Sequence, residues 1–126
     1  VVRSARPRGR SLEQPSANVE GRFGAAAAAV ARRLFVFGGQ DVGRGLSSAE
    51  VYDAAAGTWS ALPAMARRRW SASAAAVAGR IYICGGRGHR ARSDWAASFD
   101  PAGGSWSELP PLGLPRILAA AATVVP

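Results

Sequence analysis

The chain is 126 residues long, carries sixteen basic residues against eight acidic ones, and contains one cysteine. This length suits one small domain, and a single cysteine excludes an internal disulfide and favours a reducing compartment. The longest uncharged, largely apolar stretch, 117–126, is too short to cross a bilayer. The first arginines lack the apolar stretch of a secretory signal. We therefore expect a cytoplasmic protein, with the nucleus as the alternative.

All sixteen basic residues are arginines, and they give the chain a formal net charge of +8. Two explanations stay open at this point, a GC-rich gene and a surface that binds acidic partners. A protein selected for general nucleic-acid affinity usually mixes lysine with arginine, so nucleic acid is an unfavoured partner. We expect no membrane partner.

The first segment, 1–21, is rich in Arg, Pro and Ser and shows neither a strand period nor a helix period. We predict a basic disordered linker there, or the degenerate end of a preceding repeat. Because the chain begins at Val1 and stops at Pro126 within a repeat, we expect a fragment of a longer protein.

Four short strands are predicted after this segment, at residues 25–30, 34–37, 49–53 and 58–62. Alanine favours a helix by propensity, but the run at 25–30 is too short for a helix in water without strong packing. The strand interpretation is therefore preferred. The turn Ala31-Arg32-Arg33 contains no glycine, so we expect a looser hairpin there.

The same four strands return 47 residues later with no gap, at residues 71–77, 81–84, 96–100 and 105–109. A third first strand is predicted at 118–125. A fixed period of this size indicates a repeat architecture. The predicted repeats are 22–68 and 69–115, and a third one starts at 116–126.

Small residues fill the first strand of each repeat, and large aromatic residues fill the third and fourth. Four antiparallel strands in series form a meander, and the change in side-chain size predicts a sheet that tapers, as a propeller blade does. We expect Trp59 and Trp106 to pack between neighbouring sheets. Trp70 and Trp95 have no matching tryptophan in the other repeat and should be more exposed.

A glycine pair ends the second strand of each repeat, and an aromatic residue and a tryptophan follow at constant spacing. Glycine pairs let the backbone leave the strand and let a neighbouring chain approach closely. The motif residues are Gly38, Gly39, Tyr52, Trp59, Gly85, Gly86, Phe99 and Trp106. This pattern resembles the kelch repeat. The resemblance implies an all-β, kelch-type β-propeller fragment with two four-stranded antiparallel blades and the first strand of a third.

Residues that could carry chemistry are scarce. His89 is the only histidine, and Cys84 aligns with Phe37, which predicts a buried structural cysteine. Because a metal site needs several converging ligands, we expect no metal, no cofactor and no enzyme. Some kelch-like propellers are copper oxidases or epimerases, and an enzyme of that type is kept as the alternative, although the Tyr/His ligand set of the oxidases is not matched.

In an up-down meander, the loop between strands two and three lies on the same face as the connection to the next repeat. Eight arginines fall on this face against Asp41 and Asp94, whereas three arginines fall on the opposite face against two aspartates. Loops on a rigid scaffold concentrate binding residues, and guanidinium groups suit carboxylate or phosphate. The predicted partner-binding residues are Arg44, Arg67, Arg69, Arg87, Arg90, Arg92 and Arg116, and Arg68 is the eighth arginine of the face.

The kelch resemblance implies a similar function. Such propellers generally bind other proteins through this face, and many are substrate-recognition modules of cullin-based ubiquitin ligases. Arg69 and Arg116 match positions where family members often present arginine to acidic motifs. We predict a protein-interaction module for an acidic or phosphorylated segment, with non-specific polyanion binding as a further alternative. Open blade edges are expected to pair with the remaining blades or to self-associate.

Overall fold

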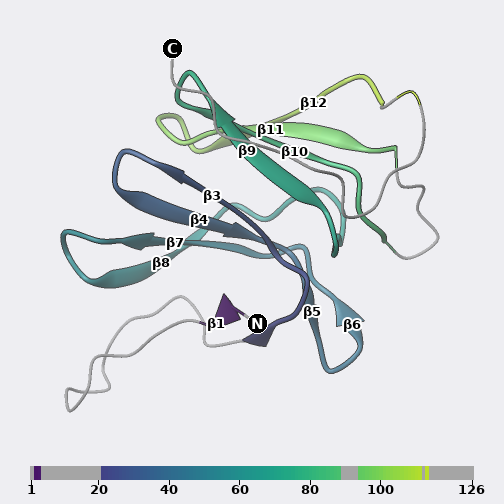
Figure 1. The fold of residues 1–126 in the computed structure, drawn as a ribbon, viewed down its shortest axis with the longest axis horizontal. Coiled ribbons are helices and arrows are strands. Elements are labelled where there is room, and N and C mark those ends of the chain that lie inside the picture. The colour runs from purple at the N-terminus through teal and green to yellow at the C-terminus, as the bar shows by residue number, and fades with distance from the viewer. Residues whose placement is uncertain (1, 4–20, 89–93, 112, 114–126) are drawn as a thin grey trace.

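The computed structural model describes residues 2–3, 21–88, 94–111 and 113, and all regular elements in these ranges are strands (Figure 1). Within these ranges there is no helix of the length and apolar character that a membrane crossing requires.

Two four-stranded antiparallel sheets, one for each predicted repeat, make up most of the described chain. The first sheet contains β3 (Ala26–Val30), β4 (Arg33–Phe37), β7 (Ala49–Asp53) and β8 (Thr58–Leu62), in that order. The second contains β9 (Ser73–Val77), β10 (Arg80–Cys84), β11 (Ala96–Asp100) and β12 (Ser105–Glu108), in that order. The all-β prediction with two four-stranded blades is therefore confirmed. The strand predicted at 118–125 lies outside the described residues.

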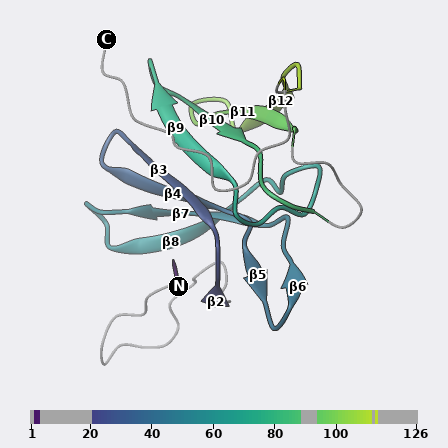
Figure 2. The ribbon, with the colours of Figure 1, turned by 45° about the vertical axis from the view of Figure 1, so that its right-hand side comes forward.

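Four shorter strands accompany the sheets. β1 (Val2–Arg3) pairs with β2 (Gly21–Arg22), so three residues of the predicted linker, Val2, Arg3 and Gly21, lie in strands, while 4–20 lie outside the described residues. β5 (Gln40–Asp41) and β6 (Arg44–Gly45) form a hairpin within the loop that joins β4 to β7. Figure 2 shows this hairpin projecting from the body of the two sheets.

The hairpin turns at the other end of the sheets have the same geometry in both repeats. Ala31 and Arg32 have φ of 51° and 64°, and Ala78 and Gly79 have φ of 51° and 80°. Each pair bridges its two strands in the same register, with two residues in the turn. The prediction of a looser first hairpin is therefore wrong. Two central residues with positive φ match the twist of the strands, and residues without glycine's freedom adopt that conformation here at a cost.

Aromatic side chains from both sheets meet between them and form the core. The ring centroids of Phe37 and Phe99 are 6.0 Å apart, and those of Phe37 and Trp106 are 5.4 Å apart. The indole Nε1 of Trp106 donates a hydrogen bond of 2.9 Å to the carbonyl of Pro63, which belongs to the segment after β8. Trp106 is therefore packed between the sheets, as predicted.

The alanine-rich strands β3 and β9 lie side by side, as Figures 1 and 2 both show. Ala26 and Ala28 of β3 and Ala76 of β9 are buried there. Because alanine is small, the two sheets approach closely at this edge, whereas large rings separate them toward β8 and β12. The taper that the sequence predicted is present.

The glycine pair after β4 contacts the segment that leads into the second repeat. Gly38 has φ of 65°, and a β-carbon placed on it would lie 2.3 Å from the carbonyl oxygen of Arg69. The N–H of Gly39 donates to that same oxygen over 2.7 Å. Only glycine combines this positive φ with so close an approach of a carbonyl oxygen. The glycine pair therefore holds the segment that enters the second repeat against the first repeat.

Candidate functional site

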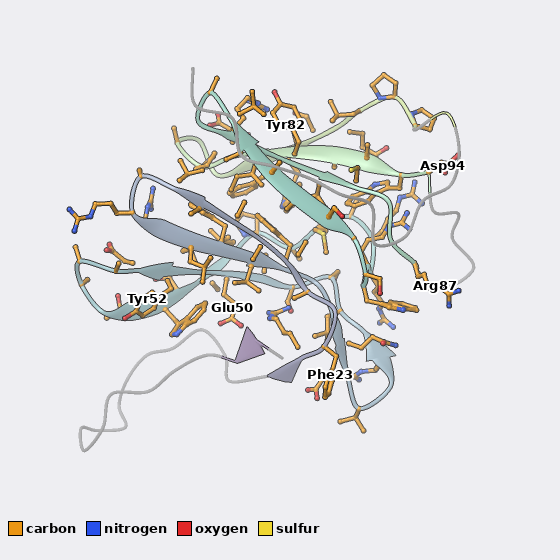
Figure 3. The ribbon with its side chains drawn as sticks, viewed as in Figure 1. Phe23, Glu50, Tyr52, Tyr82, Arg87 and Asp94 are labelled. Atoms are coloured by element: carbon orange, nitrogen blue, oxygen red, sulfur yellow. The ribbon has the colours of Figure 1, made fainter. Side chains whose placement is uncertain are left out.

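One end of the two sheets carries three connections: the β4–β7 loop, the segment between β8 and β9, and the described part of the β10–β11 loop. We call this end the loop face. Arg87 and Asp94 lie at this end, and Tyr52 lies at the opposite end (Figure 3). The loop face exposes four arginines, Arg44, Arg67, Arg68 and Arg87, and its two aspartates are half-buried. Three further predicted partner-binding residues, Arg90, Arg92 and Arg116, lie outside the described residues.

Arg22 of β2 supports the loop face from inside the first repeat. Its side chain is fully buried, and its Nε lies 3.1 Å from Oε2 of Glu50. Its Nη1 donates to the carbonyls of Gly38 and Ser48 over 2.8 and 3.0 Å, and its Nη2 donates to Oγ of Ser48 over 2.9 Å. One guanidinium therefore ties both ends of the loop that carries β5 and β6 to the buried carboxylate.

Arg69 stands 47 residues after Arg22 and is buried as well, with 2% of its surface exposed. The second repeat has Ala97 at the position of Glu50 and Trp95 at the position of Ser48. The Arg69 guanidinium carbon lies 4.6 Å from the centroid of the Trp95 ring, which is a cation–π contact. Both repeats thus bury an arginine at the same position, against the Glu50 carboxylate in the first repeat and against the Trp95 indole ring in the second.

This burial corrects two expectations from the sequence. Arg69 does not present its guanidinium at the surface, because its side chain is covered and stacked on an indole ring. Trp95 is 7% exposed, close to Trp59 at 6%, so the expected greater exposure of Trp95 is wrong. Trp70 is half-buried, and a β-carbon on Gly45 would lie 2.6 Å from its ring.

The charges around Arg69 act on its pKa in opposite directions. Burial lowers the pKa of Arg69 most, and the nearby positive charge of Arg67 lowers it further. Asp94 and Glu108 raise the pKa. The same four charged residues line a cavity of about 240 Å³. Because two arginines there face two carboxylates, the described residues that line this cavity carry no excess of either charge.

A second cavity, of about 210 Å³, lies at the base of the β5–β6 hairpin. Arg44 and Arg68 line it together with the hydroxyl-bearing Ser47 and Ser48, and none of the described residues in its lining is acidic. Both arginines are exposed. This cavity combines two positive charges with hydroxyl groups, which is the chemistry that binds carboxylate or phosphate oxygens.

Cys84 and His89 were the residues weighed for a metal site in the sequence. Cys84 is half-buried rather than buried. It points to the face of the second sheet opposite Ile83, which is fully buried against the first sheet, so the comparison with Phe37 misled the prediction. His89 lies outside the described residues. The described residues contain no group of three or more His, Cys, Asp or Glu that could hold a metal ion.

The sequence model described as the kelch motif matches two segments of the chain, 21–66 and 68–113. The chain belongs to the kelch-repeat family. Each matched segment contains one of the two four-stranded sheets, so the sheets are kelch blades. A comparison with curated proteins finds no match. Kelch repeats generally mediate protein–protein interaction.

Three features of the kelch loop face were not predicted from the sequence: the buried Arg22, the stacking of Trp95 on Arg69, and the β5–β6 hairpin. Arg22 shares the 47-residue period of Arg69, and that period indicated that the two arginines occupy equivalent positions but not that both are buried. The stacking of Trp95 on Arg69 had no such signal, because the first repeat has a serine there. The β5–β6 hairpin was signalled only by Gly43, which occupies the second turn position.

Proposed function

We propose that these kelch repeats bind a partner protein through an acidic or phosphorylated segment that contacts the loop face. The observation that carries this proposal is the cavity of about 210 Å³ at the base of the β5–β6 hairpin, which Arg44 and Arg68 both line and whose described lining residues include no acidic one. Two exposed guanidinium groups on a rigid scaffold supply planar donors for anionic oxygens.

The arginines of the loop face differ in how much charge they offer a partner. Nε of Arg67 lies 3.9 Å from Oε2 of Glu108, so part of its charge is already balanced. Arg69 is buried against Trp95 and supports the face instead of contacting a partner directly. Arg44, Arg68 and Arg87 are therefore the described residues to which we assign the main attraction. Contacts from Arg90, Arg92 and Arg116 stay predictions.

We propose a binding role in place of a catalytic one. Its support is the family, whose repeats generally mediate protein–protein interaction, together with the exposed arginines on loops of a rigid sheet. The family also offers a context, substrate recognition in a cullin-based ubiquitin ligase. A binding measurement between the full-length protein and a purified cullin scaffold decides that hypothesis.

The proposed acidic partner is tested with peptides selected from a random 12-residue display library on the 126-residue chain. We expect the recovered peptides to be rich in Asp and Glu, and a synthetic phosphoserine version to bind as well. The double variant Arg44→Ala/Arg68→Ala should weaken binding by at least tenfold, because each charge-assisted hydrogen bond contributes about 1.5–3 kcal/mol.

The matched control is Arg32→Ala/Arg33→Ala, which removes two positive charges from the opposite end of the sheets. This variant should leave the dissociation constant within about twofold, since screening over about 8 Å at physiological salt limits long-range attraction. If both double variants weaken binding equally, the chain is a diffuse polyanion binder and the assignment of a site fails.

A further inference from the structure

The tip of the β5–β6 hairpin has a backbone conformation that its sequence does not favour. Val42 and Gly43 form the two-residue turn, with φ of 53° and 75°. Turns of this kind favour Asn-Gly or Gly-Gly, because both central residues need positive φ. A β-branched residue in this region is a genuine outlier. The other two hairpin turns described above place alanine at the corresponding first position.

Packing within the chain does not offset this strained conformation. Val42 is 93% exposed, the most exposed of the large hydrophobic residues among the described ranges. Its turn partner Gly43 has open space around it, with no atom within 4 Å of the position where a β-carbon would stand. An apolar, β-branched residue therefore stands in solvent at a position where asparagine would suit the fold better. Strain of this kind points toward function more than toward stability.

The hairpin beneath Val42 is held firmly in place. Two backbone hydrogen bonds, of 3.0 and 2.8 Å, join Gln40 of β5 to Phe23, and the ring of Trp70 lies against Gly45 of β6. The N–H of Leu46 donates to the carbonyl of Gly39 over 2.9 Å. The valine is therefore presented on a supported hairpin, which lowers the ordering entropy that a mobile loop would lose on binding.

The surroundings of the hairpin indicate the chemistry of its partner. Arg44 follows the turn directly and, with Arg68, lines the basic cavity at the hairpin base. A ligand that reaches both features must place an anionic group in the cavity and an apolar surface against the tip. The positive charge of the loop face attracts carboxylates from solution, and an apolar contact beside them supplies short-range affinity.

We propose that Val42 is an apolar anchor of the partner-binding site and that the partner segment pairs an acidic residue with a neighbouring large apolar side chain that covers this valine. The inference rests on the proposed function, since it adds a second contact to the same site. A site with both contacts recognises a combined acidic and apolar motif, and a ligand that offers only negative charge binds poorly. A pure polyanion therefore binds less well than a mixed peptide of equal charge.

The experiment uses the 126-residue chain and the peptides selected from the random 12-residue library. The test variant is Val42→Asn, which completes an Asn-Gly turn and removes the apolar tip. It should raise the thermal unfolding midpoint and weaken binding of the selected peptides about tenfold or more, as expected for an apolar contact of one valine. Val42→Leu should retain binding, because it keeps the apolar surface. Ala31→Asn makes the same kind of turn change at the opposite end and should leave binding unchanged.

The outcomes separate this inference from the proposed function. If Val42→Asn binds like the wild type while Arg44→Ala/Arg68→Ala loses binding, the anchor is overturned and the acidic site stands. If neither variant loses binding, both proposals fail. Selected peptides that are acidic but contain no large apolar residue also overturn the anchor. A lowered unfolding midpoint for Val42→Asn overturns it as well, because the valine would then serve the fold.

Discussion

Removal of the Glu50 carboxylate tests how the loop face of the first repeat is supported. Glu50 has only 2% of its side chain exposed and lies 3.1 Å from Nε of the fully buried Arg22. Glu50→Ala leaves that positive charge buried with its bonds to the carbonyls of Gly38 and Ser48 and to the Ser48 hydroxyl. Breaking a buried ion pair in this way typically costs about 3–5 kcal/mol. We therefore expect the unfolding free energy to fall by that amount.

A milder change gives an intermediate result and keeps the test usable if Glu50→Ala does not fold. Glu50→Gln retains the size and one acceptor oxygen but removes the negative charge, so we expect a loss of about 1.5–3 kcal/mol. The double variant Arg22→Met/Glu50→Leu removes both charges. It should recover only part of the stability, because the carbonyls of Gly38 and Ser48 lose their donor.

The matched control is Glu108→Ala in the second repeat. Glu108 is 60% exposed and lies 3.9 Å from Nε of Arg67, which is 51% exposed. An exposed pair of this kind contributes about 0–1 kcal/mol. Equilibrium urea unfolding followed by tryptophan fluorescence measures all four variants on one scale. If Glu50→Ala and Glu108→Ala lower the unfolding free energy equally, the buried pair does not support the loop face and the argument is refuted.

Three further changes test the fold in the same urea assay. Gly38→Ala should cost several times as much as Gly79→Ala, because both glycines have positive φ but only at Gly38 would the added β-carbon clash with a backbone oxygen, that of Arg69; equal costs would contradict the close approach. Trp95→Ala should cost about 3–5 kcal/mol, as Trp59→Ala should, since both rings are buried; a loss below about 1 kcal/mol for Trp95 alone would refute its role beside Arg69. Arg32→Gly should stabilise the chain by up to about 1 kcal/mol by relieving a φ of 64°, and a destabilised variant would count against strain in that turn.

The sequence predicted the strands of both blades to within two residues. Each strand carries its own local signal, such as the β-branched and aromatic run that ends in Gly38 or Gly85, and the 47-residue period let one repeat confirm the other. The taper was also predictable, because the size of a side chain sets how closely two sheets approach. These features depend on residues near in sequence, so composition and spacing are sufficient to find them.

The β5–β6 hairpin shows where local signals end. Its strands have two residues each, which is too short for any alternating pattern to appear. Its position depends on contacts with Phe23 and Trp70, which stand elsewhere in the chain. The strained conformation of Val42 therefore emerged only once the hairpin was placed in three dimensions.

Burial of the loop-face residues was decided by tertiary structure alone. Arg67, Arg68 and Arg69 are consecutive and chemically identical, yet two are exposed and the third is stacked on Trp95. The sequence by itself determined how many arginines the loop face carries and which loops hold them. Which guanidinium reaches solvent depends on the backbone hydrogen bonds that hold Arg69 against Leu46 and Gly39 and on the indole ring of Trp95, which comes from another loop. Both require the packed sheets.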